Sequence, residues 1–403
     1  MERYHLIVAG GGISGVAAAV SAAREGLRVL LIERYGNLGG SMSHSLVFPF
    51  MRYTTKGSGK LLSDGIFTEM RERMDRLGNA SWEYFKMVFD DMVLEAGVTV
   101  LFHASVIGAV CHGDRVQSVE VATKSGRLTF EADYFIDASG DGELLAMTHC
   151  DLQVGRESDG LCQPMTTCFR ICGVDLELFR KDLPMLQEMY KKLQLEGKIT
   201  NPRENILSFI GYGKGVLHMN TTRVIQHDPT DPFAISRAEM LGRRQVAEMM
   251  AFLQTYSKAF DRSTLIAMPT HIGVRESRKL KGVHILNAEE LKSCKEFDDA
   301  IAFGCYMIDI HNPSGTGTQY YHFKDDEFYQ IPYRCLLPKE YTNLLAAGRC
   351  ISATHEAHSA IRIMPICACL GQAAGIAAAT AFQSGKNAHT VDVGTIQKKL
   401  NII

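Results

Sequence analysis

The sequence predicts an α/β protein with a parallel sheet, interrupted by a second, α+β domain. A β-α-β pattern opens the chain, with apolar runs over 4–9 and 28–33 around a helical pattern over 13–25. Alternating apolar residues with turns at HGD and KSG cover 104–138, which is typical of antiparallel strands. Between about 155 and 335 the pattern changes to long amphipathic helices mixed with strands. These three observations together define the fold class.

The opening unit justifies the parallel sheet. Residues 4–9 and 28–33 are nearly all apolar, as strands buried on both faces of a sheet should be. Gly26 follows the helical pattern and suits the left-handed position at a helix C-terminus. A right-handed crossover then places the two strands side by side and parallel.

Three later helices are indicated by their termini. A helix is expected to begin at the N-cap Ser81 and to end at Gly97. A capping box at Ser236 and Glu239 predicts a helix that runs to about 257. Near the C-terminus, residues 342–352 read as a buried strand and a loop, and a helix follows that begins near Pro365 and continues through GQAAGIAAATA.

These elements predict two domains. Residues 1–154 and 336–403 form the first, with an antiparallel insertion over about 104–131, and residues 155–335 form a substrate-facing cap domain.

Composition excludes several classes of partner. The 403 residues carry a formal net charge of −2, so we expect neither nucleic acid nor acidic membrane lipid as a partner. The stretch 366–382 is mostly alanine, too weakly apolar for us to expect a membrane span. Eleven cysteines stand without a CxxC pair or zinc-ligand spacing, so we expect no metal and reduced thiols in the cytoplasm. The sequence is compatible with a homo-oligomer.

The glycine-rich turn after the first strand predicts a phosphate site. Gly10, Gly12 and Gly15 match G-x-G-x-x-G between a strand and a helix, and Glu33 ends the second strand. Gly10 permits the tight turn, Gly12 lets backbone amides approach a pyrophosphate, and Gly15 lets helix and strand touch. Glu33 would accept hydrogen bonds from the adenosine ribose, which disfavours NADP. A glycine-rich turn can be only a turn, but this context predicts a Rossmann-like dinucleotide domain.

A second glycine pair, Gly39 and Gly40, follows the acidic residue, where a longer cofactor would need another close backbone approach. The motifs GGGISG, LIER, LGG and IDASGDGE resemble the FAD-dependent oxidoreductases of the glutathione-reductase and fumarate-reductase type. GVRESRKLKG, YMIDIHNP, IPYRCLLP and the long motif over 343–375 resemble a bacterial branch called FAD-dependent oxidoreductase. This resemblance covers nearly the whole chain and implies FAD as the cofactor.

The resemblance also implies which positions hold the cofactor. The predicted FAD-binding residues are Gly10, Gly12, Ile13, Ser14, Gly15, Glu33, Arg34, Gly39, Gly40, Ser41, Val106, Ser139, Gly140, Asp141, Gly348, Arg349 and Gly371. Arg349 departs from the family pattern, in which an acidic residue often stands, and we expect it to contact pyrophosphate or to fold back on its loop. The N-terminus of the last long helix would face the flavin, where its dipole stabilises a reduced, anionic ring.

Missing motifs exclude neighbouring flavoprotein classes. No cysteine pair follows the second glycine pair, which argues against thiol-disulfide chemistry. GYGKGV and GTGTQ do not form a second G-x-G-x-x-G, so NAD(P)H would have no dedicated fold here. The stretch KGSGKLL (56–62) is similar to the end of a phosphate loop. Thr54, however, stands where such a loop has its first glycine, which argues against ATP.

The predicted catalytic residues are His311, His355, Arg275 and Arg362. Histidine can move a proton near neutral pH, and arginine can bind a carboxylate or stabilise an oxyanion. We therefore hypothesise hydride transfer between flavin N5 and a small polar metabolite, either a sugar-like alcohol or a carboxylated alkene. Two alternatives stay open, an FAD-containing lyase and a non-catalytic flavin-binding module. The sequence does not identify the electron donor or acceptor.

Overall fold

The computed structural model describes residues 3–77 and 83–402. Its main sheet has the strand order β3-β2-β1-β6-β5-β4, and β17 also pairs with β6. The bounds of these strands are β1 Arg3–Ala9, β2 Val29–Ile32, β3 Thr99–Leu101, β4 Ser105–His112, β5 Arg115–Thr123, β6 Gly126–Asp137 and β17 Leu344–Ala346. β1, β2, β3, β17 and the end of β6 are parallel, whereas β4 and β5 are antiparallel. The α/β fold with a parallel sheet is confirmed.

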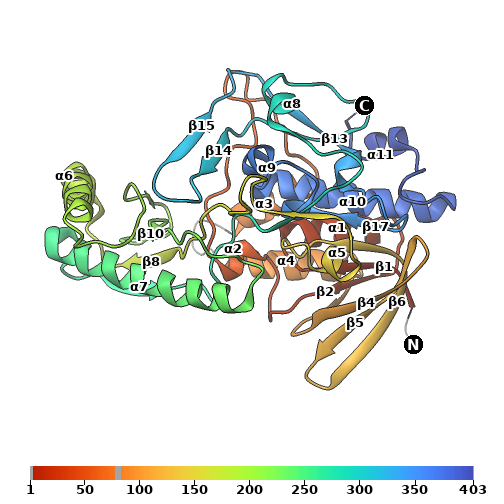
Figure 1. Cartoon of the computed structure of the whole chain (residues 1–403), viewed down its shortest axis with the longest axis horizontal. Coiled ribbons are helices and arrows are strands. Elements are labelled where there is room, and N and C mark those ends of the chain that lie inside the picture. The colour runs from red at the N-terminus through yellow and green to blue at the C-terminus, as the bar shows by residue number, and fades with distance from the viewer. Residues whose placement is uncertain (1–2, 78–82, 403) are drawn as a thin grey trace.

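One long strand joins the two halves of this sheet. The first residues of β6, from Gly126 to Glu131, pair antiparallel with β5, and its last residues pair parallel with β1 and β17. The antiparallel strands project from the lower right of the molecule in Figure 1. The predicted turns HGD and KSG stand between these strands. The alternation over 104–138 was therefore read correctly.

The helices have bounds set mostly by local signals. They are α1 Ile13–Arg24, α2 Ser41–His44, α3 Ile66–Arg76, α4 Tyr84–Glu95, α5 Glu143–Met147, α6 Leu176–Leu195, α7 Pro232–Tyr256, α8 Ala288–Lys292, α9 His355–Ile361, α10 Met364–Ser384 and α11 Val393–Lys399, with short 3₁₀ turns η1 Lys258–Phe260, η2 Tyr333–Leu336 and η3 Gly348–Cys350. The predicted helices at 13–25 and near Pro365 are confirmed as α1 and α10. The predicted N-cap Ser81 lies outside the described residues.

The predicted start of α7 is wrong. The helix begins at Pro232, and the side chain of Asp231 accepts hydrogen bonds from the amides of Phe233 and Ala234. Ser236 instead donates back to the carbonyl of Pro232 inside the first turn, and Glu239 accepts from the amide of Ile272. An aspartate N-cap followed by proline starts a helix one turn earlier than the apparent capping box.

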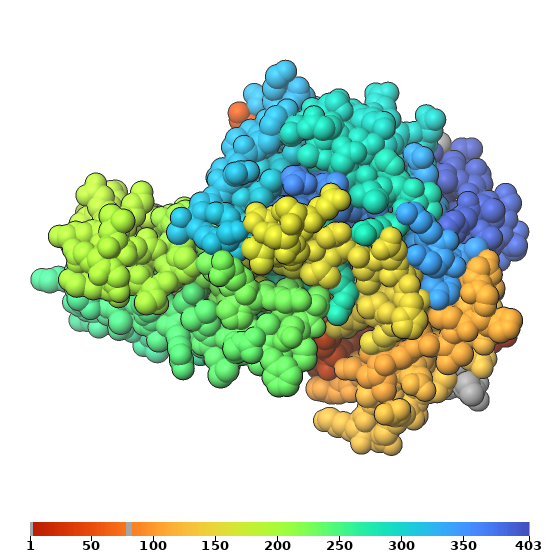
Figure 2. Space-filling view, in the orientation of Figure 1, coloured from red at the N-terminus to blue at the C-terminus, as the bar shows by residue number. Residues whose placement is uncertain are grey.

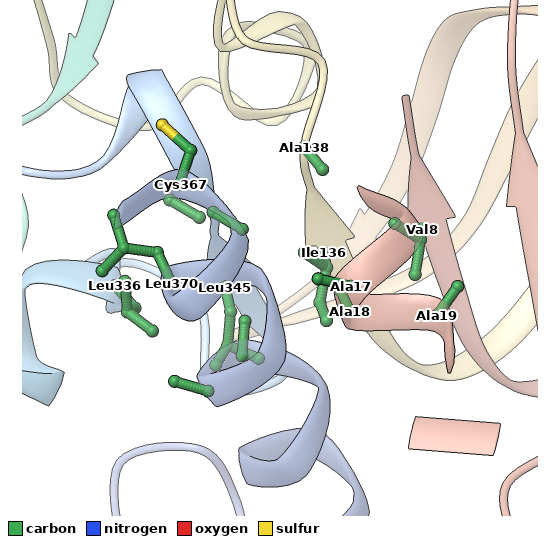
Figure 3. Close-up of a cluster of buried hydrophobic side chains, with 14 of the residues drawn as sticks. Val8, Ala17, Ala18, Ala19, Ile136, Ala138, Leu336, Leu345, Cys367 and Leu370 are labelled. Carbon is green, nitrogen blue, oxygen red and sulfur yellow. The ribbon is translucent and has the colours of Figure 1, made fainter. Parts of the chain in front are cut away.

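α1 and α10 pack closely at the centre of the larger core (Figure 3). A Cβ atom at Gly371 would lie 2.0 Å from the carbonyl oxygen of Ser14, and one at Gly375 would lie 2.2 Å from that of Ala18. Small residues on both helices therefore allow the backbones to approach. α10 is long and apolar enough to span a membrane by composition, but 89 % of its most apolar window is buried inside the protein.

A second hydrophobic core lies in the arm at the left of Figures 1 and 2. It is built from buried residues between Phe169 and Phe260, on α6, α7 and a four-stranded sheet. The strands of that sheet are β8 Phe169–Cys172, β9 Ser208–Phe209, β10 Leu217–Met219 and β11 Thr264–Ala267. Buried side chains between Leu280 and Tyr333 pack in the larger core. The domain boundaries at 154 and 335 stay a prediction.

The remaining strands form three two-stranded pairs. They are β7 Leu152–Val154 with β12 Arg278–Leu280, β13 Ala300–Gly304 with β16 Tyr329–Pro332, and β14 Ile308–His311 with β15 Thr318–Tyr321. All eleven cysteines are free. No group of three or more potential metal ligands occurs within residues 3–77 and 83–402.

Candidate active site

A cavity of about 1000 Å³ opens where the parallel strands end. Residues that directly follow β1, β2, β6 and β17 line it, namely Gly10, Glu33, Ala138 and Ala347. Ligands of doubly wound sheets bind at this carboxyl edge. From there the cavity continues to residues of the loops around β8 and β14. One space therefore joins the glycine-rich turn to the predicted catalytic residues.

The three glycines of the first turn have separate reasons to lack a side chain. Gly10 has φ +102°, and a Cβ there would lie 2.6 Å from the carbonyl oxygen of Ala138. A Cβ on Gly15 would lie 1.8 Å from the carbonyl oxygen of Gly10, because the helix rests on the turn. Around Gly12 the only protein atom within 4 Å of such a Cβ, among the described residues, is Cα of Gly40 at 3.7 Å. Gly12 thus borders open cavity.

The second glycine pair packs directly on the first turn. Gly39 donates its amide to the carbonyl of Gly11, and Gly40 would bring a Cβ to 2.8 Å from Cα of Gly12. Gly39 and Gly40 both have positive φ, and Ser41 begins α2 beside them. The two glycine pairs form one wall of the cavity.

This wall fits the diphosphate of a dinucleotide. α1 begins at Gly12 with no side-chain cap, and Ile13 and Ser14 of its first turn line the cavity. Uncapped amides and the positive end of the helix dipole favour an anion at this position. The space beside Gly12 that a side chain would fill is the space a pyrophosphate needs. The residues present therefore fit FAD.

Glu33 lies at the predicted ribose position and is 5 % exposed. Its Oε2 accepts a hydrogen bond of 2.7 Å from the amide of Gly11, and its Oε1 accepts one of 2.9 Å from the amide of Tyr35. Burial raises the pKa of Glu33. A carboxylate has further lone pairs for ribose hydroxyls. Val106 and Arg34 also line the cavity.

Ser139, Gly140 and Asp141, together with Arg349, line the cavity next to Gly10. Arg349 Nη2 lies 3.1 Å from Oδ1 of Asp141, so this arginine pairs with the loop that follows β6 and does not fold back on its own loop. Ser277 donates a hydrogen bond of 2.6 Å to the same oxygen. Burial would raise the pKa of Asp141, but Arg349 and Ser277 hold it below its ordinary value.

Three predicted cofactor residues do not line the cavity. Gly15, Gly348 and Gly371 stand behind its wall, where a Cβ would meet Gly10 or Ser14 at 2.4 Å or less. Because these three residues have no side chain, their segments can pack closely against the residues that form the wall. The other predicted cofactor residues all line the cavity.

At the far end, the cavity is lined by Arg203, Arg275 and Arg362. Arg275 donates hydrogen bonds to the carbonyl of Pro164 and to Oγ1 of Thr166. Burial, together with Arg362 nearby, lowers the pKa of Arg275 to about 9. Arg362 lies 3.7 Å from Oδ2 of Asp309. This end of the cavity is cationic.

His311 lies beside these arginines and lines the cavity. Its Nδ1 is 3.1 Å from Nη2 of Arg223, which can only donate, so the ring proton is assigned to Nε2, 3.4 Å from Oδ2 of Asp309. Tyr306 donates a hydrogen bond of 3.0 Å to the same carboxylate oxygen. Burial and the charge of Arg275 lower the pKa of His311 to about 3. The imidazole is therefore neutral at pH 7.

His355 is not brought to the cavity. It is the first residue of α9, and its Nδ1 lies 2.7 Å from Oε2 of the fully buried Glu276. The structure thus joins three of the four predicted catalytic residues and separates the fourth. His358, the next histidine on α9, has its Nε2 3.0 Å from the carbonyl oxygen of Arg349.

Several lining residues were not predicted. Arg203, Thr166 and Tyr306 come from segments with no recognisable spacing between them. Tyr306 stands five residues before His311 in YMIDIHNP, and this proximity was the one local signal. Arg203 reaches the cavity from the arm, which no local pattern indicates.

The fold and this cavity define a dinucleotide-binding flavoprotein of the Rossmann type. Residues 5–400 match the family described as FAD dependent oxidoreductase, and the chain belongs to that family. The members of this family are enzymes that use FAD as their cofactor. No curated protein matches the chain.

One solved structure shares the fold at low identity, and two others show a weaker overall similarity. A geranylgeranyl bacteriochlorophyll reductase-like protein from Thermoplasma acidophilum is 14 % identical, with a TM-score of 0.52 over 100 % of this chain and 83 % of that one. The myxobacterial chondrochloren halogenase CndH is 15 % identical, with a TM-score of 0.46 over 99 % of this chain and 78 % of that one. A p-nitrophenol 4-monooxygenase from Pseudomonas putida is 10 % identical, with a TM-score of 0.45 over 100 % and 81 %.

Proposed function

We propose that the protein catalyses hydride transfer between FAD and a small metabolite that carries a carboxylate. The observation that supports this substrate class is the charge at the far end of the cavity. Arg203, Arg275 and Arg362 line it and Arg223 stands behind it, whereas the carboxylates paired with these arginines are Glu204 and Asp309. A buried excess of about two positive charges is stable only when an anion offsets it.

This charge favours one of the two substrate classes that the sequence left open. A sugar-like alcohol is neutral and leaves the guanidinium groups uncompensated. A carboxylated alkene or alcohol offers an anion with two oxygens in the geometry that guanidinium groups bind. Arg275 and Arg362 are the residues expected to hold it, because both line the cavity and neither has a full ion pair of ordinary length among the described residues.

Bound FAD supplies the hydride chemistry at N5. The protein residues bind and orient the substrate. The arginines fix the carboxylate, so the reacting carbon is held in one position relative to the cofactor wall. Ile363, Met364 and Cys367, at the N-terminus of α10, line the cavity between these two regions. That helix terminus favours negative charge beside it.

His311 is the proposed proton carrier. Its pKa is low while the arginines around it are uncompensated. A bound carboxylate offsets their charge and raises the pKa of His311, because the imidazolium is no longer surrounded only by cations. Asp309 holds the Nε2 proton of the ring, and Arg223 holds Nδ1. Nε2 already carries a proton, so a further proton goes to Nδ1 and the hydrogen bond from Arg223 must break. Oγ1 of Thr318, 3.2 Å from Nδ1, can then accept a hydrogen bond from the imidazolium.

The test compares an anion with its neutral analogue on the FAD-loaded protein. Succinate and succinamide have the same skeleton, and each is titrated while the flavin absorbance is followed. We expect succinate to bind and succinamide to bind at least about ten-fold more weakly, because a charge-assisted pair is lost. Arg362→Met should remove most of this preference. Arg156→Met is the matched control, because Arg156 pairs with Asp159 and does not line the cavity.

A second measurement tests turnover. The flavin is reduced under anaerobic conditions, and an unsaturated dicarboxylate such as fumarate is added as a hydride acceptor. Reoxidation by fumarate and not by its diamide supports the proposal. Equal binding of succinate and succinamide, unchanged in the Arg362 variant, refutes the carboxylate site. A bound flavin that no donor reduces and no acceptor reoxidises refutes hydride transfer.

A further inference from the structure

A buried charged cluster lies behind the cavity wall. Glu276 and Lys279 are both 0 % exposed, and they form an ion pair with each other. Lys279 also donates a hydrogen bond of 2.9 Å to the carbonyl of Gly155. Burial would raise the pKa of Glu276, but its contacts with His355 and Lys279 lower it to about 2. None of the three residues lines the cavity.

A buried ion pair is weak evidence for stability, because well-packed apolar residues often replace one without loss. The contacts of Glu276 point to another role. Its Oε2 accepts a hydrogen bond of 3.0 Å from the amide of Gln163. The side-chain oxygen of Gln163 in turn accepts from Nη2 of Arg362 and from the amide of His311, both at 3.4 Å. Glu276 therefore holds the backbone of Gln163, whose side chain contacts both Arg362 and the backbone of His311.

A second route leads from Glu276 to the same arginine. His355, beside Oε2 of Glu276, opens the seven-residue helix α9, and Arg362 is the C-cap of that helix. A short helix is rigid along its length, so fixing its first residue fixes where its last turn points. A third connection leads from Glu276 to the other arginine and is covalent, because Arg275 directly precedes Glu276 in the chain. Arg275 and Arg362 are thus both linked, through these contacts and the chain, to the one carboxylate of Glu276.

We infer that Glu276, with His355 beside it, is a positioning residue that sets the separation of the Arg275 and Arg362 guanidinium groups. The inference rests on the carboxylate site of the proposed function. The Glu276 carboxylate itself touches neither substrate nor cofactor. It acts through Gln163, through α9 and through the backbone of Arg275. This explains why the sequence pattern around His355 looked catalytic although the side chain faces away from the cavity.

The test removes both buried charges together. Glu276→Gln alone would leave Lys279 buried without a counter-charge and would destabilise the fold for that reason. The double variant Glu276→Gln/Lys279→Met has no such charge. A matched control is Glu25→Gln/Lys399→Met, which removes an ion pair remote from the cavity. A further variant, Gln163→Leu, keeps the ion pair and removes the side-chain amide whose oxygen accepts from Arg362 and from the backbone of His311.

Three readouts are compared for each FAD-loaded protein: the unfolding temperature, the FAD content and the dissociation constant for succinate. We expect the Glu276/Lys279 and Gln163 variants to keep their FAD and to bind succinate at least about ten-fold more weakly, because the charge-assisted hydrogen bonds from the displaced guanidinium groups are weakened. The control double variant should bind succinate as the wild type does. A purely structural role would lower the unfolding temperature without this selective loss of affinity.

Crystal structures supply a readout that needs no ligand. In the Gln163→Leu protein, and in the double variant if it folds, the guanidinium groups of Arg275 and Arg362 should lie at a changed separation. Unmoved guanidinium groups, or unchanged succinate affinity in Gln163→Leu, overturn the inference. If wild-type protein binds no succinate yet the variant structures show displaced arginines, the carboxylate function fails and the positioning role stands.

Discussion

Alanine substitutions at two glycines of the first turn should separate cofactor binding from folding. Gly12 has φ −67° and ψ 177°, which alanine adopts without strain, and the added Cβ would meet no described protein atom closer than 3.7 Å. Gly15 is equally near the cofactor in sequence, but its Cβ would lie 1.8 Å from the carbonyl oxygen of Gly10. The added methyl group would therefore stand in open space in Gly12→Ala and in a packed backbone contact in Gly15→Ala.

The magnitudes follow from these distances. Ordinary contacts of a Cβ begin at 3.4 Å, so Gly15→Ala must separate two backbone segments by about 1.6 Å. Overpacking of this kind costs about 3 kcal/mol or more. For a chain of 403 residues we expect an unfolding temperature lower by about 3 to 4 °C or more. Gly12→Ala should unfold within about 2 °C of the wild type when both are free of FAD, and should bind FAD at least about ten-fold more weakly.

The assay is thermal unfolding of the FAD-free proteins, combined with a fluorescence titration of each with FAD. Gly97→Ala is the control, because a Cβ there would meet no described atom within 4 Å. Its φ is +74°, so the change in its unfolding temperature measures backbone strain without a packing clash. Full FAD affinity in Gly12→Ala would refute the assignment of the pyrophosphate to this turn. Wild-type stability in Gly15→Ala would refute the packing argument.

Three further predictions concern charge. Arg349→Ala should weaken FAD binding about ten-fold, measured by flavin release, because Asp141 loses the cation 3.1 Å away and becomes an unpaired negative charge at the cofactor wall. Burial and Arg170 lower the pKa of His218 to about 3, below its ordinary 6.5, so folding stability is lost as pH falls between 6.5 and 3. By pH 4, the free energy of unfolding should have fallen by up to about 3 kcal/mol less in His218→Phe than in the wild type. Urea unfolding curves at a series of pH values measure this, and a pH dependence equal to that of the wild type would contradict it. Succinate binding near pH 6 should take up a fraction of a proton at His311, measured by calorimetry in two buffers, and an identical heat in both buffers would contradict the proposed pKa rise.

The cofactor half of the molecule could be predicted from sequence because its signals are local. The turn at Gly10 to Gly15 and the pair at Gly39 and Gly40 each lie within a few residues, and periodicity alone identified β1, α1 and β2. The apparent capping box at Ser236 was misleading because Asp231 and Pro232 provide a stronger start, one turn earlier. Local signals therefore compete, and the better N-cap decided the helix start.

The substrate half could not be predicted in the same way. Arg203 and Arg362 line one cavity, and Gln163 contacts Arg362, only because distant segments fold together, and their separations in sequence follow no repeating pattern. A histidine on a short helix such as α9 also gives no sign of which face is buried. His355 faces the interior and His311 faces the cavity, although both stand in similar polar motifs.

The stretch from Arg275 to Lys279 shows how the two halves are joined. Neighbouring side chains of an extended chain point in opposite directions. Arg275 lines the substrate end, Ser277 bonds Asp141 at the cofactor wall, and Glu276 between them faces the buried cluster. Successive side chains of this stretch therefore serve different parts of the site. For that reason Ser277→Ala, which removes one hydrogen bond at the cofactor wall, should lower FAD affinity and leave succinate affinity in the FAD-loaded protein unchanged, whereas the Glu276/Lys279 double variant should do the reverse.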